Sequence, residues 1–139
     1  PRRSLPECEW ADVLSVSDGD TIRVELNGER ERLRYVGIDA PELNAEAGQP
    51  EPFAREATEA NEQLVGGERI CLERDVSDRD RFGRLLRYAW LEDGTLVNEA
   101  LVLVGLAEAV EFRPDTKHHD SILSPAQDKA IAAERGIWR

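Results

Sequence analysis

The chain has 139 residues, of which 40% are apolar and 34% charged, and its formal net charge is −11. This length suits one globular domain with its own core and is too short for two. No apolar run approaches the roughly 18 residues that cross a bilayer, which excludes a membrane-spanning helix. The negative charge argues against a protein that binds by neutralising phosphates over a broad surface. No signal-peptide pattern opens the sequence, which decides nothing about export because a chain can already be processed.

The first elements in chain order are a loose polar lead-in, residues 1–9, and a β-hairpin. Apolar residues alternate with polar ones from Val13 and again, after the Asp18-Gly19-Asp20 break, over Ile22, Val24 and Leu26, which is the period of half-buried strands and predicts one strand on each side of the break. Asn27-Gly28 then forms the turn, because both residues tolerate the positive φ of a type I′ turn. A return strand is predicted over residues 31–38.

The rest of the chain supplies three helices and two more strands. Asn98 is a possible helix cap, and Ser124 with Gln127 three residues later has the spacing of a capping box. The expected segments are a loop over 43–52, a helix over 53–65, strands over 69–73 and 84–91, and helices over 96–105 and 124–135. This order predicts an α+β fold, a five-stranded Greek-key barrel with a helix inserted after the third strand.

Two aspartates at the ends of the hairpin strands are candidate metal ligands. The register set by the Asn27-Gly28 turn brings Asp20 close to Tyr35, and Asp39 lies at the same end of the sheet. Two converging carboxylates repel each other unless a cation lies between them, and hard oxygen ligands favour Ca²⁺ or Mg²⁺. Ordinary turn chemistry is the alternative, and it is favoured for Asp18.

Three further charged residues stand near these acids. Arg34 shares the parity of Val36 and Ile38 and is therefore expected on the apolar side, where it needs a carboxylate or a ligand phosphate as partner. An internal Arg–Glu ion pair would satisfy it equally well. Arg84 begins a strand, where an exposed edge arginine is the alternative. Glu42, beside a rigid proline turn, could activate water or be an ordinary loop glutamate.

Taken together, the motifs resemble the staphylococcal nuclease family, in unbroken order from about residue 10 to the end of the chain. They are DGDT (18–21), LRYVGIDAPE (33–42), DRFGRLLRY (80–88), VNEALVLVGLA (97–107) and GIW (136–138). The resemblance implies an OB-type nuclease barrel with three α-helices over residues 10–139. It also implies calcium-dependent hydrolysis of phosphodiester bonds in DNA and RNA to 3′-phosphorylated products. Single strands are the favoured substrate, and the chain is expected to act as a monomer.

The resemblance also implies roles for individual residues. A pentacoordinate phosphate gathers negative charge, so a cation and two guanidiniums stabilise it more than the ground state. The positions carried over are Asp20, Asp39 and the backbone carbonyl of Ala40 for the calcium ion, Glu42 as general base, and Arg34 and Arg84 at the scissile phosphate.

The expected nucleotide pocket departs from the family pattern. Arg81 and Phe82 keep a basic residue and an aromatic ring before the second arginine, although without a phenolic hydroxyl. A tyrosine-rich stretch is replaced by a segment in which Phe112 is the aromatic residue. Base stacking is worth roughly 1–3 kcal/mol per base, so weaker substrate binding is expected. His118 and His119 are interpreted as surface-loop residues without a role.

Cys8 and Cys71 have no metal-type spacing. In the family's barrel the first and fourth strands are neighbours, so the two cysteines could face each other. Free thiols and a disulfide both remain open at this point. A disulfide would favour an exported protein.

Two other functions remain as alternatives to the enzyme. One is a non-catalytic OB-type module that binds nucleic acid or protein, as when such domains become adaptors. The other is a purely structural arrangement in which Arg34 satisfies Glu42 and no metal binds. Adaptors of this kind lose the acids and arginines, so the presence of all five favours the nuclease.

Overall fold

The computed structural model describes residues 2–45 and 48–139, and this part of the chain forms a closed five-stranded barrel beside three α-helices. The strands follow one another in the order β1-β2-β3-β6-β5, with β1 pairing with β5 to close the barrel. Strands β3 and β6 run parallel, and the other barrel pairs are antiparallel. The barrel strands are β1 (Glu9–Val16), β2 (Thr21–Leu26), β3 (Glu29–Tyr35), β5 (Arg69–Glu73) and β6 (Leu85–Trp90). The predicted fold class is confirmed.

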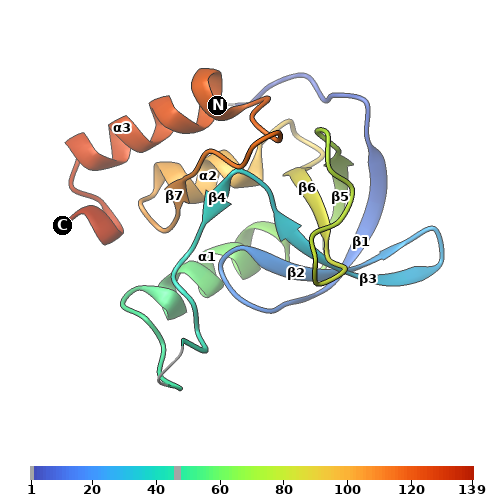
Figure 1. Ribbon diagram of the computed structural model, residues 1–139, viewed down its shortest axis with the longest axis horizontal. Coiled ribbons are helices and arrows are strands. Elements are labelled where there is room, and N and C mark those ends of the chain that lie inside the picture. Colours follow the sequence, from blue (N-terminus) through green and yellow to red (C-terminus); the bar gives the residue numbers. More distant parts are fainter. Residues whose placement is uncertain (1, 46–47) are drawn as a thin grey trace.

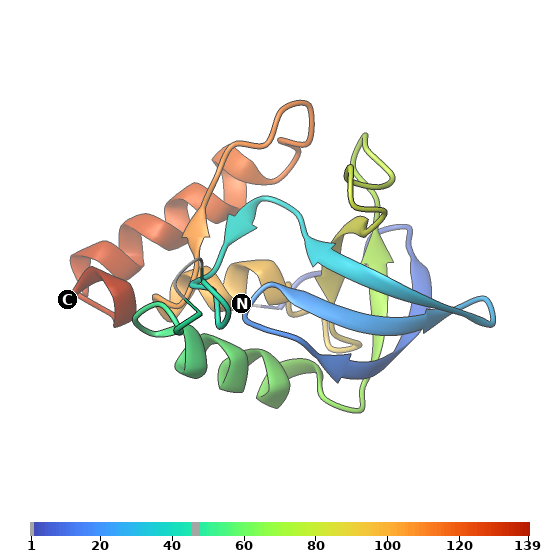
Figure 2. The ribbon, with the colours of Figure 1, turned by 60° about the horizontal axis from the view of Figure 1, so that its bottom comes forward.

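The helices gather on one side of the barrel (Figure 1, Figure 2). Helix α2 packs against α1, α3 and β6, and α1 also contacts β1. The helices are α1 (Ala54–Val65), α2 (Val97–Leu103) and α3 (Ser124–Ala132), with a π-helical turn η1 (His119–Leu123) before α3 and a 3₁₀ turn η2 (Gly136–Trp138) after it. A short ribbon of β4 (Ile38–Asp39) and β7 (Glu108–Ala109) lies between α3 and the barrel. Among the described residues, no helix is both long and apolar enough to cross a membrane.

The hairpin forms as its turn residues predict. Asn27 and Gly28 have φ of 53° and 82°, the positive values that a type I′ turn requires. Ile22 and Val24 are fully buried in the barrel, whereas Arg23 between them is exposed. The core continues from the barrel to the helices and includes Ile22, Leu33, Ile70, Leu101 and Leu123.

The return strand does not run unbroken over residues 31–38. Strand β3 ends at Tyr35, the chain turns at Gly37 with a φ of 83°, and the short β4 follows. The alternation of side chains is therefore lost after Tyr35, and the parity argument for Arg34 was wrong. Leu33 and Tyr35 are the fully buried neighbours, and Arg34 lies on the opposite face of the strand.

Neither predicted helix cap forms. Asn98 lies inside α2, fully buried, where it accepts a hydrogen bond from the N–H of Ala89 and donates one to the carbonyl of Val36. Ser124 continues the helical turn of η1 instead of starting a helix after a loop. The side chain of Gln127 accepts a hydrogen bond from a backbone N–H of β7. Both polar side chains thus join separate elements, a role that local spacing cannot reveal.

The lead-in is held against the barrel rather than loose. The N–H of Arg3 donates to the carbonyl of Gly94 at 2.9 Å, and its guanidinium pairs with both oxygens of the buried Glu99 on α2. Cys8 and Cys71 form a disulfide between the start of the chain and β5. The question left open by the sequence is answered in favour of the disulfide.

Candidate functional site

Asp20, Asp39 and Arg34 meet at one end of the β2–β3 hairpin. The Nη2 atom of Arg34 lies 3.4 Å from Asp20 Oδ2 and 3.4 Å from Asp39 Oδ1. Its Nη1 atom donates to the carbonyls of Tyr35 and Ile38 at 2.5 and 2.8 Å. The two carboxylates therefore converge on one nitrogen, as the hairpin register predicted. Arg34 is paired with aspartates, so the hypothesis that it satisfies a glutamate instead is wrong.

The turn before β2 fixes Asp20. Asp18 Oδ1 accepts the N–H of Asp20 at 3.1 Å, which confirms the turn role expected for Asp18. The carboxylate of Asp20 is itself buried and accepts the N–H of Ala40 at 2.8 Å. Gly19 allows this packing, because a Cβ there would lie 2.7 Å from the Cβ of Ala57 on α1.

Negative charge at this point exceeds the positive charge of Arg34. Burial and the neighbouring charge of Asp20 raise the pKa of Asp18 to about 6. Burial also raises the pKa of Asp39, although Arg34 opposes the shift. A buried carboxylate, Asp20, beside a more exposed one, Asp39, with incomplete charge compensation, is suited to a divalent cation with hard oxygen ligands. Within residues 2–45 and 48–139, no three His, Cys, Asp or Glu side chains form a metal-binding group, so Asp20 and Asp39 would need backbone carbonyls, phosphate and water to complete a coordination shell.

A cavity of about 470 Å³ opens beside Arg34. One wall is the β5–β6 loop (residues 74–84), and the other is the loop after β7 (residues 110–118, hereafter the 110–118 loop). Both loops rise from the same side of the molecule in Figure 2. The cavity brings together five predicted site residues: Arg34, Arg81, Phe82, Arg84 and Phe112.

The aromatic rings of the cavity lie next to guanidinium groups. Arg81 and Arg84 face the ring of Phe82, with Cζ at 4.8 and 5.6 Å from its centroid. The Cζ of Arg34 lies 5.7 Å from the centroid of Phe112. Both rings are exposed, at 56% for Phe82 and 43% for Phe112. The cavity thus offers aromatic and cationic surface to a ligand.

Glu42 is not brought into this cavity. Its side chain is exposed, its N–H donates to Glu51 Oε1 at 2.7 Å, and its carbonyl accepts the N–H of Glu51 at 2.9 Å. Asp39 and Ala40 line a separate pocket of about 310 Å³ together with Glu51. Glu42 lines neither this pocket nor the cavity beside Arg34.

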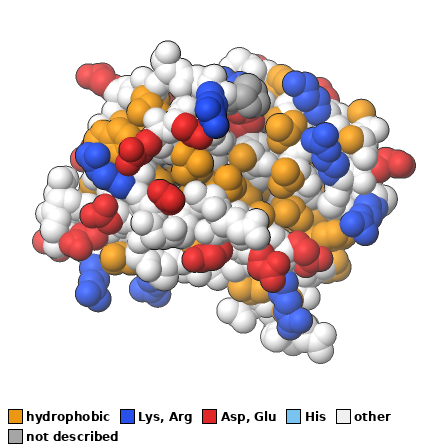
Figure 3. All heavy atoms as spheres, turned by 180° about the vertical axis from the view of Figure 1, so that it is seen from behind, with side chains coloured by type: hydrophobic (Ala, Val, Ile, Leu, Met, Phe, Trp, Pro, Cys, Tyr) orange, Lys and Arg blue, Asp and Glu red, His pale blue; other side chains and the backbone are white. Residues whose placement is uncertain are grey.

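The face shown in Figure 3 carries acidic and basic side chains interspersed with exposed apolar ones. The net charge of the chain is therefore not gathered there as a block of one sign. By contrast, the cavity is lined by five arginines against two aspartates. A locally cationic cleft on an acidic protein is compatible with binding a short stretch of phosphate backbone.

Sequence reasoning missed two acids that shape the cavity. Asp80 accepts the Nε–H of Arg84 at 2.7 Å, and its place within an arginine-rich run was an available signal. Asp115 is 5% exposed and accepts the N–H groups of Val76 and Ser77 at 2.9 and 2.8 Å. No local pattern pointed to Asp115, because its partners lie almost 40 positions away in the chain.

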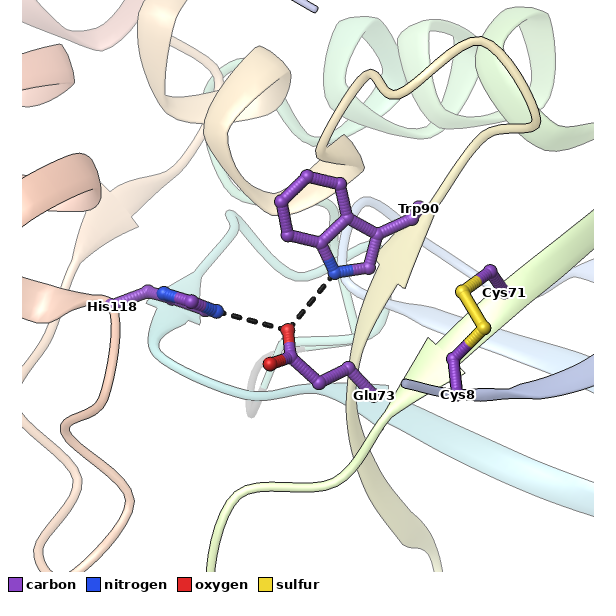
Figure 4. Close-up of a disulfide and its surroundings, with 5 residues drawn as sticks. All are labelled: Cys8, Cys71, Glu73, Trp90 and His118. Carbon is purple, nitrogen blue, oxygen red and sulfur yellow. Dashed lines mark hydrogen bonds and ion pairs between the residues drawn. A yellow bond between two sulfur atoms is a disulfide. The ribbon is translucent and has the colours of Figure 1, made fainter. Parts of the chain in front are cut away.

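The surface-loop interpretation of His118 was also wrong. Its Nε2 lies 2.9 Å from Glu73 Oε1, and the same oxygen accepts a hydrogen bond from the indole of Trp90 at 3.0 Å (Figure 4). Lys117 Nζ binds the other oxygen of Glu73 at 2.6 Å. These contacts attach the 110–118 loop to the barrel, near the disulfide shown in the same figure.

Comparisons with known proteins agree with this fold. Residues 32–139 match the family described as staphylococcal nuclease homologue. A thermonuclease of Staphylococcus hyicus is 36% identical over 126 residues, which cover 91% of this chain and 73% of that protein. Endonuclease YncB of Bacillus subtilis is 37% identical over 123 residues, 87% of this chain and 57% of that protein, and the SPbeta prophage-derived endonuclease YokF is 38% identical over 41% of its length. The chain belongs to the staphylococcal nuclease family.

Proposed function

We propose that this chain is a calcium-dependent nuclease that hydrolyses phosphodiester bonds of DNA and RNA to 3′-phosphorylated products. The observation that carries the proposal is the convergence of Asp20 and Asp39 on Arg34, at the edge of a cavity that Arg84 also lines. Relatives named thermonuclease and endonuclease support the reaction class. The number of carboxylates around Arg34 supports a divalent cation.

Asp20, Asp39 and the carbonyl of Ala40 would hold the calcium ion, in keeping with its preference for oxygen ligands. When bound, the ion supplies positive charge that stabilises the phosphate oxygens as they become more negative. The low exposure of Asp20 and its bond to the N–H of Ala40 support a rigid first ligand.

In this proposal Arg34 and Arg84 bind the scissile phosphate. Guanidinium groups grip phosphate in bidentate fashion, and their charge counts for more as the phosphate becomes pentacoordinate. Arg34 is held by two carbonyls and Arg84 by a carboxylate, so both are ordered before substrate arrives. Groups ordered in advance stabilise a transition state without reorganising.

Glu42 is the proposed general base. It would take a proton from a water molecule as the water oxygen bonds to phosphorus in line with the bond to the 5′-oxygen. That bond breaks, the electron pair leaves on the 5′-oxygen, and the phosphate stays on the 3′-oxygen. The side chain of Glu42 is exposed, so it is open to the water molecule that this step requires.

Single strands are the favoured substrate, since a base must leave its stack to contact the exposed rings of Phe82 and Phe112. Arg81 would add a phosphate contact at the same wall. The molecule is proposed to act as a monomer. The disulfide supports an exported setting, because such bonds persist in oxidising compartments.

The test is digestion of a single-stranded DNA oligonucleotide with calcium and then with excess chelator, with the 3′ ends of the products analysed. Cleavage is expected with calcium only, and products should carry a 3′-phosphate. Arg34→Ala and Arg84→Ala should each lower kcat by about 10²–10³-fold while remaining folded, as Glu42→Gln should. Arg30→Ala, on the exposed tip of the same hairpin as Arg34, is the matched control and should retain activity.

Three outcomes would reverse parts of the proposal. Undiminished cleavage in chelator removes the metal from the reaction. Binding of the oligonucleotide without any cleavage favours the non-catalytic module instead. Wild-type turnover in one of the substituted proteins removes that residue from the mechanism.

A further inference from the structure

The turn that leads into β6 is organised by the carboxylate of Asp80. Its Oδ1 atom accepts the backbone N–H groups of Phe82 and Arg84 at 2.9 and 3.0 Å. Its Oδ2 atom accepts the Nε–H of the Arg84 side chain at 2.7 Å. The N–H of Asp80 also donates to the carbonyl of Arg84 at 2.9 Å. One carboxylate therefore fixes both the backbone and the guanidinium of Arg84.

The same turn is anchored to strand β3 from outside. Arg79 makes a bidentate ion pair with Glu31 at 2.9 and 2.8 Å and donates to the carbonyl of Gly83 at 3.0 Å. Arg32 donates to the carbonyl of Phe82. Because β3 also carries Arg34, these contacts tie the two proposed phosphate ligands to one rigid element.

The contact with Asp80 determines which nitrogens of Arg84 remain for a ligand. Its Nε is occupied by the carboxylate, and one face of the guanidinium lies towards the ring of Phe82. In the described part of the chain, the two terminal nitrogens have no hydrogen-bond partner, and Arg84 lines the cavity. A paired terminal nitrogen fork is the shape that grips phosphate oxygens. Asp80 thus leaves the two terminal nitrogens of Arg84 available to a ligand while it restricts rotation of the guanidinium.

We propose that Asp80 is the positioning residue for Arg84, holding its guanidinium in the orientation that binds the scissile phosphate. This inference rests on the nuclease function proposed above. Misplacement of a catalytic group by about 1 Å can cost roughly 10²-fold in rate, so the positioning has a measurable effect. If Asp80 only stabilised the turn, its substitution would lower the stability of the fold and leave the orientation of the Arg84 guanidinium unchanged.

The decisive variant is Asp80→Asn. The amide keeps an oxygen for the backbone N–H groups but loses the charge that binds the guanidinium. We expect kcat to fall by about 10²-fold with a smaller change in KM, and no further loss when the substitution is made in Arg84→Ala. Asp80→Glu, which restores a carboxylate, should recover part of the activity. Asp93→Asn is the matched control, since Asp93 accepts the N–H of Thr95 in a similar turn away from the cavity.

A second measurement does not depend on activity. In the ¹⁵N NMR spectrum the Nε–H of Arg84, assigned by its loss in Arg84→Ala, should exchange slowly with solvent in the wild type and faster in Asp80→Asn. If Asp80→Asn does not fold, Asp80→Ser provides the same comparison. The positioning role would be overturned if the Nε–H of Arg84 exchanged at the same rate in Asp80→Asn as in the wild type. It would also be overturned if the losses in kcat from Asp80→Asn and Arg84→Ala multiplied when the two substitutions were combined. Absence of wild-type cleavage would overturn the nuclease proposal, and the exchange measurement would still decide whether Asp80 orders Arg84.

Discussion

Gly19 lies where the turn before β2 packs against helix α1, and the two are too close together for any side chain at this position. A Cβ at this position would lie 2.7 Å from the Cβ of Ala57 and 2.8 Å from that of Ala40. We expect Gly19→Ala to lower the free energy of unfolding by about 1–3 kcal/mol, because the core must move to accept the methyl group. It should also weaken the proposed calcium binding, since the turn carries Asp20. Urea unfolding and calorimetric calcium titration measure the two effects.

Gly28→Ala separates the local clash from the general cost of replacing glycine. Gly28 has a φ of 82°, and a Cβ there would meet no atom within 4 Å. Its substitution should cost about 1–2 kcal/mol from the left-handed backbone alone and leave calcium binding unchanged. Equal calcium affinity in both variants would show that Asp20 does not depend on the packing of Gly19.

At the residue scale the sequence predicted what depends on near neighbours. The hairpin turn set the register that brings Asp20 close to Arg34, whereas Asp39 reaches Arg34 from β4, after the bend at Gly37. The face on which Arg34 lies was not predictable, because the bend at Gly37 ends the alternation on which parity depends. The requirement for Gly19 was not predictable either, since the atoms that it approaches come from distant segments.

Asp115 joins the two loops that form the walls of the cavity. Its buried carboxylate on the 110–118 loop accepts two backbone N–H groups of the β5–β6 loop. Asp115→Ala removes both hydrogen bonds, so the walls lose their fixed separation. We expect KM for a single-stranded oligonucleotide to rise roughly tenfold, the equivalent of about 1.4 kcal/mol, with a smaller change in kcat.

Asp115→Asn is the matched variant for this prediction. The amide keeps an oxygen acceptor for both N–H groups, so its KM should stay closer to that of the wild type. Steady-state kinetics on the same oligonucleotide compare the two. A wild-type KM in Asp115→Ala would mean that the walls hold their separation without this carboxylate.

At the element scale the sequence predicted the strands and helices but not the side-chain hydrogen bonds that connect them. Local patterns predicted every barrel strand and α-helix, with hydrophobic periodicity indicating the hairpin strands and α1, and the spacing of Ser124 and Gln127 indicating α3. Asn98 and Gln127 matched capping patterns, yet in the fold they bond to a neighbouring strand and to the β4–β7 ribbon. A polar side chain of this kind has the same local appearance in both roles, so only the packed structure distinguishes them.

The disulfide acts on the whole molecule, because it joins residues 63 positions apart. Closing a loop of that length in the unfolded chain corresponds to about 4 kcal/mol in the loop-entropy account. Cys8→Ser with Cys71→Ser should therefore lower the free energy of unfolding by up to about that amount. Urea unfolding with and without reductant measures it. Reductant should destabilise the wild type alone, and equal stability of the two proteins would contradict the prediction.

The acid stability of the molecule should depend on Glu73, which attaches the 110–118 loop to the barrel. Burial alone would raise the pKa of Glu73, but the contacts with His118, Lys117 and Trp90 outweigh burial and lower it to about 2 from an ordinary value of 4.5. A depressed pKa means that the ionised group stabilises the fold fully above pH 4.5 and loses that contribution as the pH falls towards 2. The difference in unfolding free energy between the wild type and Glu73→Gln should therefore shrink across this interval. For the control Glu25→Gln, on the exposed face of β2, the difference in unfolding free energy from the wild type should not shrink in this interval. If the difference for Glu73→Gln stayed constant with pH, Glu73 would be excluded as the source of the acid sensitivity.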